Sequence, residues 1–203
     1  MYIIAATHNK NKLREFGEIF GCDVHSASDL GVTTDPEENG KTFSENSKIK
    51  ATAIYDELIT KENLPEGNFW VIADDSGLCV DALDGAPGVY SARYASTDGH
   101  NATDEENVIK LLKELENVKE EDRKAAFVCA ITAINRKGEI YTEEGYLKGY
   151  IAYEPVGNGG FGYDPVMYIK NKGKTVAEMT PDEKNAISHR GQALKKLKEK
   201  IWS

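Results

Sequence analysis

The sequence predicts one mixed α/β domain covering residues 1–203, and three features support this class. Short apolar runs rich in β-branched residues alternate with stretches whose apolar residues recur at helical spacing. Two of the runs, residues 125–134 and 139–153, are separated only by Asn-Arg-Lys-Gly, a sequence typical of a hairpin turn. The sequence contains no repeat, low-complexity tract or long linker. It therefore supports no domain boundary, although two lobes are compatible with it.

The individual elements follow from the apolar spacing and from the residues that interrupt it. A single C-terminal helix is expected from about residue 181, carrying Leu194, Leu197 and Ile201. The other expected elements are a strand at 2–6, a helix ending near 20, a helix from about 43 to 61, a strand at 69–73, an acidic turn at 74–77, a strand at 78–80, a helix at 105–115, the two hairpin strands and an apolar run at 166–169.

Composition and charge exclude several classes of protein. A chain of 203 residues with 40% apolar side chains is long enough to bury a core without disulfides or metals. Its 25 basic and 34 acidic residues give a formal net charge of −9. Because nucleic acids and anionic membranes are bound through basic surfaces, we expect neither as a partner. A small anionic substrate is still compatible with a local cluster of lysines.

The cysteines and the N-terminus indicate the compartment. Cys22, Cys79 and Cys129 are odd in number, far apart and without metal-ligand spacing, which is typical of buried free thiols in a reducing environment. The N-terminus has no basic leader, and its apolar run is far shorter than the ~20 residues that cross a membrane. We therefore expect a cytoplasmic protein.

A first polar cluster follows the first strand. In open α/β sheets, ligands bind beyond the carboxyl ends of strands, and free N–H groups at a helix N-terminus attract phosphate. The cluster therefore predicts a phosphate site, although a helix cap and a solvated basic turn explain the same residues. Its members are Thr7, His8, Asn9, Lys10, Asn11 and Lys12.

A second cluster begins with two adjacent carboxylates, Asp74 and Asp75, at the end of an apolar strand. Mg²⁺ would offset their repulsion, and because side chains alternate in a strand, only one of the two would face a given site. The structural alternative is an Asx turn before Ser76 and Gly77.

A third cluster, Glu37 and Glu38, precedes a helix that carries Lys48 and Lys50. These carboxylates would add an oxygen ligand, and the lysines a phosphate contact. A solvated loop with acidic residues near a helix N-terminus explains the same sequence.

A fourth cluster combines aromatic rings, an acid and basic residues, a set suited to stacking on a heterocycle and bonding to its edge. In the alternative interpretation the two aromatic rings belong to the core, and the basic pair lies on a helix surface. Its members are Phe161, Gly162, Tyr163, Asp164, Lys184, Ser188, His189 and Arg190.

Five segments occur in an order and spacing that are informative together: THNKNKLREF, TFSENSKIKA, ADDSGLCVDALDGAPGVYSARYA, GGFGYDP and EKNAISHRGQAL. Through them the chain resembles the inosine/xanthosine triphosphate pyrophosphatase family, enzymes that clean the nucleotide pool. The resemblance runs from about residue 3 to about residue 197. His8 departs from the glycine that many relatives have at this position.

The resemblance implies a homodimeric protein with a long central mixed β-sheet flanked by helices and an active-site cleft between two lobes. It also implies Mg²⁺-dependent hydrolysis of ITP, dITP or XTP to the nucleoside monophosphate and pyrophosphate. Asp75 is implied as the catalytic base and as a metal ligand. A glutamate is implied as a second ligand, and the register leaves both Glu37 and Glu38 as candidates.

Substrate contacts are also implied by the resemblance. The loop after the first strand would bind phosphate, so we expect the Asp75 carboxylate to lie near Thr7, Asn9 and Lys12 on one side of the sheet. A purine with a 6-oxo group and N1–H would accept at O6 and donate at N1, the reverse of adenine. The implied residues are Thr7, His8, Asn9, Lys10, Asn11, Lys12, Lys50, Ser76, Phe161, Gly162, Tyr163, Asp164, Lys184, His189 and Arg190.

The residues fit two other functions less well. A non-catalytic purine nucleotide-binding or sensor protein would use the same loop and pocket, but it would gain nothing from extra carboxylates beside a triphosphate. A phosphotransferase is disfavoured because the sequence lacks a GxxxxGK[ST] loop.

Overall fold

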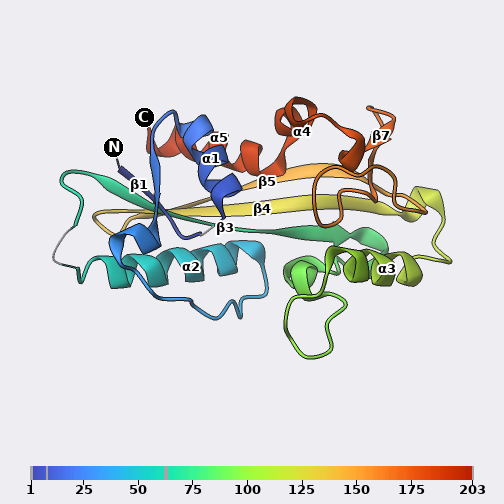
Figure 1. Cartoon of the computed structure of the whole chain (residues 1–203), viewed down its shortest axis with the longest axis horizontal. Helices are drawn as coiled ribbons and strands as arrows, with labels where there is room; N and C mark the ends of the chain where they lie inside the picture. Colours follow the sequence, from blue (N-terminus) through green and yellow to red (C-terminus); the bar gives the residue numbers. More distant parts are fainter. Residues whose placement is uncertain (1, 8, 62–63, 203) are drawn as a thin grey trace. The chain divides into compact units, whose positions relative to one another are not determined.

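The computed structural model describes residues 2–7, 9–61 and 64–202. Strands in this part of the chain form a mixed sheet in the order β2-β1-β3-β4-β5-β6-β7 (Figure 1). β1 pairs in parallel with β2 and β3, whereas β6 pairs antiparallel with β5 and β7. The predicted mixed sheet flanked by helices is thus confirmed. The strands are β1 (Tyr2–Ala5), β2 (Val24–Ser26), β3 (Phe69–Val80), β4 (Lys124–Asn135), β5 (Ile140–Ile151), β6 (Met167–Ile169) and β7 (Lys174–Thr175).

The main helices begin at polar caps. The Thr42 side chain accepts from the Glu45 N–H, and Thr103 and Thr180 form capping boxes with the glutamate three residues on. Those three caps begin α2 (Phe43–Leu58), α3 (Asp104–Glu114) and α4 (Pro181–Ile187); the other α-helices are α1 (Lys10–Phe20) and α5 (His189–Ile201). Among the described residues, no helix is long and apolar enough to cross a membrane.

The chain divides into two compact units. Unit 1 comprises residues 1–75, 129–145 and 189–203, and unit 2 comprises residues 76–128 and 146–188. Strands β3, β4 and β5 contribute residues to both units. The sequence showed no such boundary because each unit is built from segments that are far apart along the chain.

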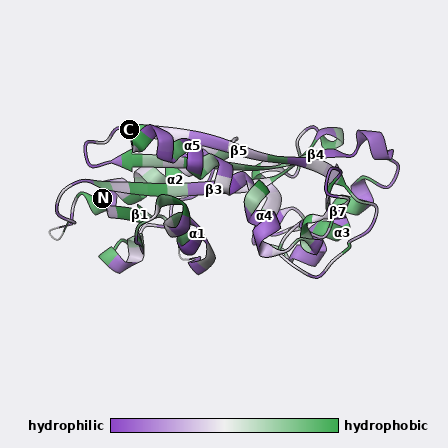
Figure 2. Ribbon diagram, turned by 90° about the horizontal axis from the view of Figure 1, so that it is seen from above, coloured by the Kyte–Doolittle hydropathy of each residue, from purple (hydrophilic) through white to green (hydrophobic). Residues whose placement is uncertain are grey.

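In unit 1, β3 packs differently on its two faces. Trp70 and Ile72 belong to a cluster with residues of α1 and α5, whereas Phe69 and Val71 pack with residues of α2. These helices accordingly lie on opposite sides of β3 (Figure 1). Residues 69–73 of β3 are buried on both faces, so this part of the strand is apolar at every position and does not alternate (Figure 2).

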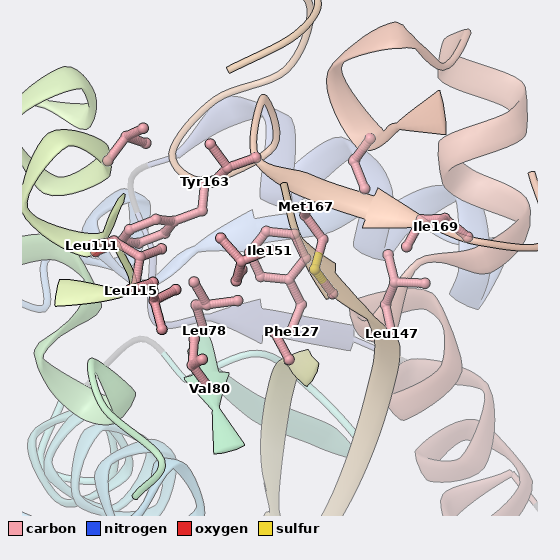
Figure 3. Packing of buried hydrophobic residues seen from close by; sticks show 14 of the residues in the cluster. Leu78, Val80, Leu111, Leu115, Phe127, Leu147, Ile151, Tyr163, Met167 and Ile169 are labelled. Atoms are coloured by element: carbon pink, nitrogen blue, oxygen red, sulfur yellow. The ribbon is translucent and has the colours of Figure 1, made fainter. Parts of the chain in front are cut away.

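Unit 2 has its own apolar core. Leu78 and Val80 from the second half of β3 pack with residues of α3, β4, β5 and β6. The side chains of Leu78, Leu115, Phe127 and Ile151 converge in Figure 3.

A buried arginine organises one end of unit 2. Arg123 is 2% exposed and donates to backbone carbonyls: from Nε to Val118 at 3.1 Å, from Nη1 to Ala152 at 2.8 Å and from Nη2 to Leu115 at 2.6 Å. Leu115 caps the C-terminus of α3, where a positive charge is favourable. The planar fork of arginine reaches several carbonyls at once, which lysine cannot do.

We expect Arg123→Lys to lower the free energy of unfolding by about 2–4 kcal/mol, because at least two buried carbonyls lose their donor. Denaturant unfolding of both chains measures the change. Arg136→Lys is the matched control: Arg136 donates to the Pro65 and Gly67 carbonyls at an exposed site, where water replaces the lost bonds. Equal effects of the two substitutions would contradict the structural role of Arg123.

Two expectations about the elements were wrong. Residues 74–77 do not form an acidic turn, because β3 continues from Phe69 to Val80. Basic side chains from distant segments pair with both aspartates and make a continuous strand tolerable. The expected C-terminal helix is broken at Ser188, whose ψ of 128° is not helical, into α4 and α5. The strands β2 and β7 were not predicted at all.

Candidate active site

Strand β3 presents its two aspartates to opposite faces of the sheet. Asp74 follows the side of Trp70 and Ile72, and Asp75 follows the side of Phe69 and Val71. The expectation that only one of the two reaches a given site is confirmed. β1 ends at Ala5, which is opposite Ile72, so both aspartates lie beyond the carboxyl end of β1.

On the α2 face, a lysine lies between two carboxylates. The Lys50 Nζ is 2.8 Å from Glu38 Oε2 and 3.5 Å from Asp75 Oδ1. Asp75 Oδ2 also accepts a hydrogen bond from the Asn46 Nδ2 at 3.1 Å. Glu37 is exposed, whereas Glu38 is half-buried at the cluster. The structure therefore favours Glu38 over Glu37 as the second acidic residue.

The charged groups of this cluster change one another's pKa values. Burial raises the pKa of Asp75 above its ordinary value, although Lys50 and Asn46 act in the opposite direction. Burial by itself would lower the pKa of Lys50, but Asp75 and Glu38 outweigh it and the pKa is raised, so the ammonium stays charged. A half-buried carboxylate with a raised pKa is suited to accepting a proton near neutral pH.

A cavity with a mixed polar and apolar lining opens on the same face. It measures about 420 Å³, and Thr7 from the first loop and Lys50 from α2 both line it. Ser26, Ser28 and Thr34 add hydroxyl groups to its wall. Thr7 thus lines the same cavity as Lys50. The expected proximity of the first loop to Asp75 itself stays a prediction.

On the opposite face, Asp74 joins two helices to β3. Its carboxylate lies 2.9 Å from the Lys12 Nζ and 3.2 Å from the Arg190 Nε. Arg190 also bonds to Glu15 at 2.9 Å. Burial by itself would raise the pKa of Asp74, but Lys12 and Arg190 lower it well below its ordinary value.

This pairing corrects the expected arrangement of the loop. Lys12 was expected beside Asp75, but its ammonium pairs with Asp74 on the other side of the strand. The reason is that Lys12 lies in the first turn of α1, which packs on the face that Asp74 occupies. Arg190 was expected at the purine edge, but it is buried and bonded to two carboxylates.

The remaining loop residues have local roles or fall outside the description. Asn9 accepts from the Lys12 N–H at 3.3 Å, as a residue capping the start of α1 does, and its own N–H donates to Thr7 Oγ1 at 3.1 Å. Lys10 is exposed at the start of α1. His8 and the side chain of Asn11 lie outside the described residues.

Unit 2 brings together part of the fourth cluster. The Lys184 Nζ is 2.6 Å from Asp164 Oδ2 and 4.5 Å from the centroid of the Phe161 ring. Asp164 is 3% exposed, whereas Phe161 is 66% exposed. A buried acceptor, a cation and an open aromatic face therefore lie side by side. Gly162 donates its N–H to Asp104 Oδ2 at 2.6 Å.

Tyr163 does not belong to this group. Its ring is buried in the core of unit 2, near Leu111 and Leu115 (Figure 3), and its hydroxyl donates to the Ser91 carbonyl at 2.8 Å. The alternative interpretation of Tyr163 as a core residue is the one that the structure supports. Ser76 is half-buried in β3, and His189 begins α5. The predicted cleft between lobes stays a prediction.

The side chains of the cluster fit the metal that the resemblance implies. Among residues 2–7, 9–61 and 64–202, no three histidine, cysteine or acidic side chains group closely enough to hold an ion by themselves. Asp75 and Glu38 supply two carboxylates beside one lysine. Mg²⁺ is usually bound through one or two carboxylates together with substrate phosphates and water, so these two residues fit it.

Sequence reasoning missed Asn46 and the partners of Asp74. Asn46 lies four residues before Lys50, on the buried side of α2 that also carries Phe43 and Ala51. A polar residue within an apolar helix face is a signal that could have identified it. The partners of Asp74 lie 62 and 116 residues away, and no local pattern indicates such pairs.

The cysteines agree with the sequence interpretation. None of the three forms a disulfide in the described part of the chain, and Cys129 is buried whereas Cys22 and Cys79 are half-buried.

A mixed sheet with a charged cluster beyond the end of a parallel strand places the chain among α/β proteins whose ligands bind at strand ends. More narrowly, the chain belongs to the Ham1 family, whose model matches residues 3–200. A Clostridium perfringens protein named dITP/XTP pyrophosphatase is 50% identical over 201 residues, covering 98% of this chain and 96% of the relative. A Bacillus subtilis protein of the same name is 49% identical over 197 residues, covering 96% and 93%.

Solved structures agree with this membership. The structure described as the Staphylococcus aureus Ham1 protein superposes with a TM-score of 0.86 at 39% identity. The superposition covers 100% of this chain and 98% of the Staphylococcus aureus chain. A nucleoside-triphosphatase, or dITP/XTP pyrophosphatase, from Mycobacterium abscessus superposes with a TM-score of 0.77 at 40% identity, covering 97% and 98%.

Proposed function

We propose that the chain is a nucleoside triphosphate pyrophosphatase that hydrolyses deaminated purine nucleotides, namely ITP, dITP and XTP, to the monophosphate and pyrophosphate. The observation that carries the proposal is the cluster of Asp75, Lys50 and Glu38 on the α2 face. The full-length relatives named dITP/XTP pyrophosphatase support the same activity.

The reaction needs an activated water, a neutralised triphosphate and a leaving pyrophosphate. Asp75 accepts a proton from the water whose oxygen bonds to the α-phosphorus. The bond from that phosphorus to the bridging oxygen breaks, and the oxygen leaves with the pyrophosphate. Lys50 offsets phosphate charge, and the Thr7 hydroxyl offers a donor from the wall of the cavity.

Mg²⁺ is the proposed cofactor. Asp75 and Glu38 would hold it, and when bound it would supply further neutralisation of the triphosphate. The resemblance to the family also supports our proposals of a homodimer and of a cytoplasmic location.

The purine edge is proposed to bind to unit 2. Asp164 and Lys184 offer an acceptor and a donor, which match the N1–H and the O6 of a 6-oxo purine. Adenine presents the reverse order, so buried groups would stay unpaired with ATP. Lys184 takes this role rather than Arg190, because Lys184 lies over the exposed Phe161 ring, whereas Arg190 is 7% exposed and binds Asp74 and Glu15.

Incubation of the purified chain with ITP and Mg²⁺ tests the proposal. We expect IMP and pyrophosphate in equal amounts, loss of turnover with EDTA, and much slower turnover of ATP. Release of orthophosphate would instead indicate a stepwise phosphatase. Binding of ITP without any product would indicate a nucleotide-binding protein.

A further inference from the structure

Asn46 is a buried asparagine that touches two parts of the site. It lies on α2 and is 1% exposed. Its Nδ2 donates to Asp75 Oδ2 at 3.1 Å, and its Oδ1 accepts from the Gly40 N–H at 2.8 Å. One amide therefore connects the candidate base to the segment that follows Glu38.

The two bonds require opposite chemistry at the two ends of one side chain. The carboxylate of Asp75 needs a donor, and the Gly40 N–H needs an acceptor. An aspartate at position 46 has the same shape but offers only acceptors when ionised. A leucine offers neither group, so asparagine is the side chain of this size that satisfies both partners.

Gly40 makes the close approach of the loop possible. A Cβ built on Gly40 would lie 2.7 Å from Asn46 Oδ1 and 2.7 Å from the Glu45 Cβ, which is closer than real contacts. The loop can therefore lie against α2 in this way only with glycine at this position. The nearby Lys41 N–H donates to Glu45 Oε2 at 2.6 Å and fastens the same segment.

We propose that Asn46 is a positioning residue for hydrolysis: it holds the Asp75 carboxylate beside Lys50 and fixes the loop that carries Glu38. The inference rests on the proposed function. At 1% exposure Asn46 is shielded from any ligand, so it acts through Asp75 and not on the substrate. Its loss should lower kcat more than it raises KM.

The first variant is Asn46→Asp, which keeps the acceptor for Gly40 and removes the donor to Asp75. We expect kcat for ITP to fall about 10- to 100-fold, because a small misplacement of a reacting group has effects of this size. KM should change less than about threefold. In hydrogen exchange followed by NMR, the Gly40 amide should stay protected, because its acceptor is still present.

The second variant is Asn46→Ala, which removes both bonds without adding charge. We expect a similar fall in kcat together with faster exchange of the Gly40 amide. If Asn46→Asp does not fold, Asn46→Ala still tests the positioning role of Asn46. Thermal unfolding of the ligand-free chain shows whether each variant folds.

Asn107→Asp is the matched control. Asn107 is 3% exposed on α3, where its Oδ1 accepts from the Ala95 N–H at 2.8 Å and its Nδ2 donates to the Ala92 carbonyl at 3.2 Å. The same chemical change at similar burial should lower the thermal stability, whereas kcat per folded molecule should stay within about twofold of the parent chain.

The outcomes distinguish a failure of the proposed function from a failure of the positioning role of Asn46. A parent chain that releases no pyrophosphate from ITP overturns the proposed function and the inference with it. An active parent with equally active, folded Asn46 variants overturns the inference alone, as does a loss of kcat that Asn107→Asp matches. An active parent with slow Asn46 variants and an active Asn107→Asp variant supports both.

Discussion

Replacing Asp75 by asparagine lowers kcat for ITP by about 10²–10⁴-fold, the range that general-base help typically contributes. The substitution keeps the shape of the side chain and leaves an oxygen that can accept from the Asn46 Nδ2. It removes the charge next to Lys50 and the site that accepts the proton from water. Steady-state kinetics with ITP and Mg²⁺ give the size of the loss.

Folding has to be separated from chemistry in this experiment. The circular dichroism spectrum and the melting temperature of Asp75→Asn should stay close to those of the parent chain. Asp56→Asn on the exposed side of α2 is the matched control, and it should retain full turnover. Near-parental turnover by pure, folded Asp75→Asn would show that another group is the base.

Asp74→Asn lowers the free energy of unfolding at pH 7 by about 3–5 kcal/mol, the usual effect of breaking a buried ion pair by removing one partner. The carboxylate is 3% exposed and serves both Lys12 and Arg190, so its loss leaves the buried guanidinium with Glu15 as its remaining carboxylate partner. Urea unfolding of the parent and the variant measures the difference.

The difference should also depend on pH in a defined direction. The pKa of Asp74 is lower in the folded chain than its ordinary value of 3.8, so the unfolded chain binds more protons between the two values. The stability that Asp74 contributes is therefore complete above pH 3.8 and is lost as the pH falls below it. The difference in unfolding free energy between the parent chain and Asp74→Asn should therefore become smaller as the pH falls below 3.8.

A surface pair provides the control for this effect. The Glu18 Oε1 lies 3.7 Å from the Arg14 Nε, and both side chains are largely exposed. Glu18→Gln should leave the unfolding free energy close to that of the parent chain at every pH. A similarly small effect of Asp74→Asn would contradict the role of the buried pair in joining α1, β3 and α5.

Local patterns in the sequence predicted much of the framework. The strand at the N-terminus, the helices at 43 and 104 and the hairpin of β4 and β5 follow from apolar spacing and from Asn135 and Gly138 at the turn. The alternation of side chains also predicted correctly that only one aspartate of the adjacent pair joins Lys50. These are properties of neighbouring residues.

The errors came from long-range contacts. A turn at Asp74 is the better local interpretation, and the strand continues because charges from α1 and α5 pair with its carboxylate. For the same reason the pairing of Lys12 with Asp74 and of Arg190 with Asp74 and Glu15 was not predicted. The choice between Glu37 and Glu38 depended on how a loop folds back on Lys50, which spacing alone does not determine.

Hydrolysis of ITP in ¹⁸O-labelled water, followed by mass spectrometry of the products, tests most directly whether water attacks the phosphorus nearest the sugar. The account predicts one labelled oxygen in the IMP and none in the pyrophosphate. Label in pyrophosphate or orthophosphate would show that water attacks elsewhere on the chain of phosphates, and it would contradict the account.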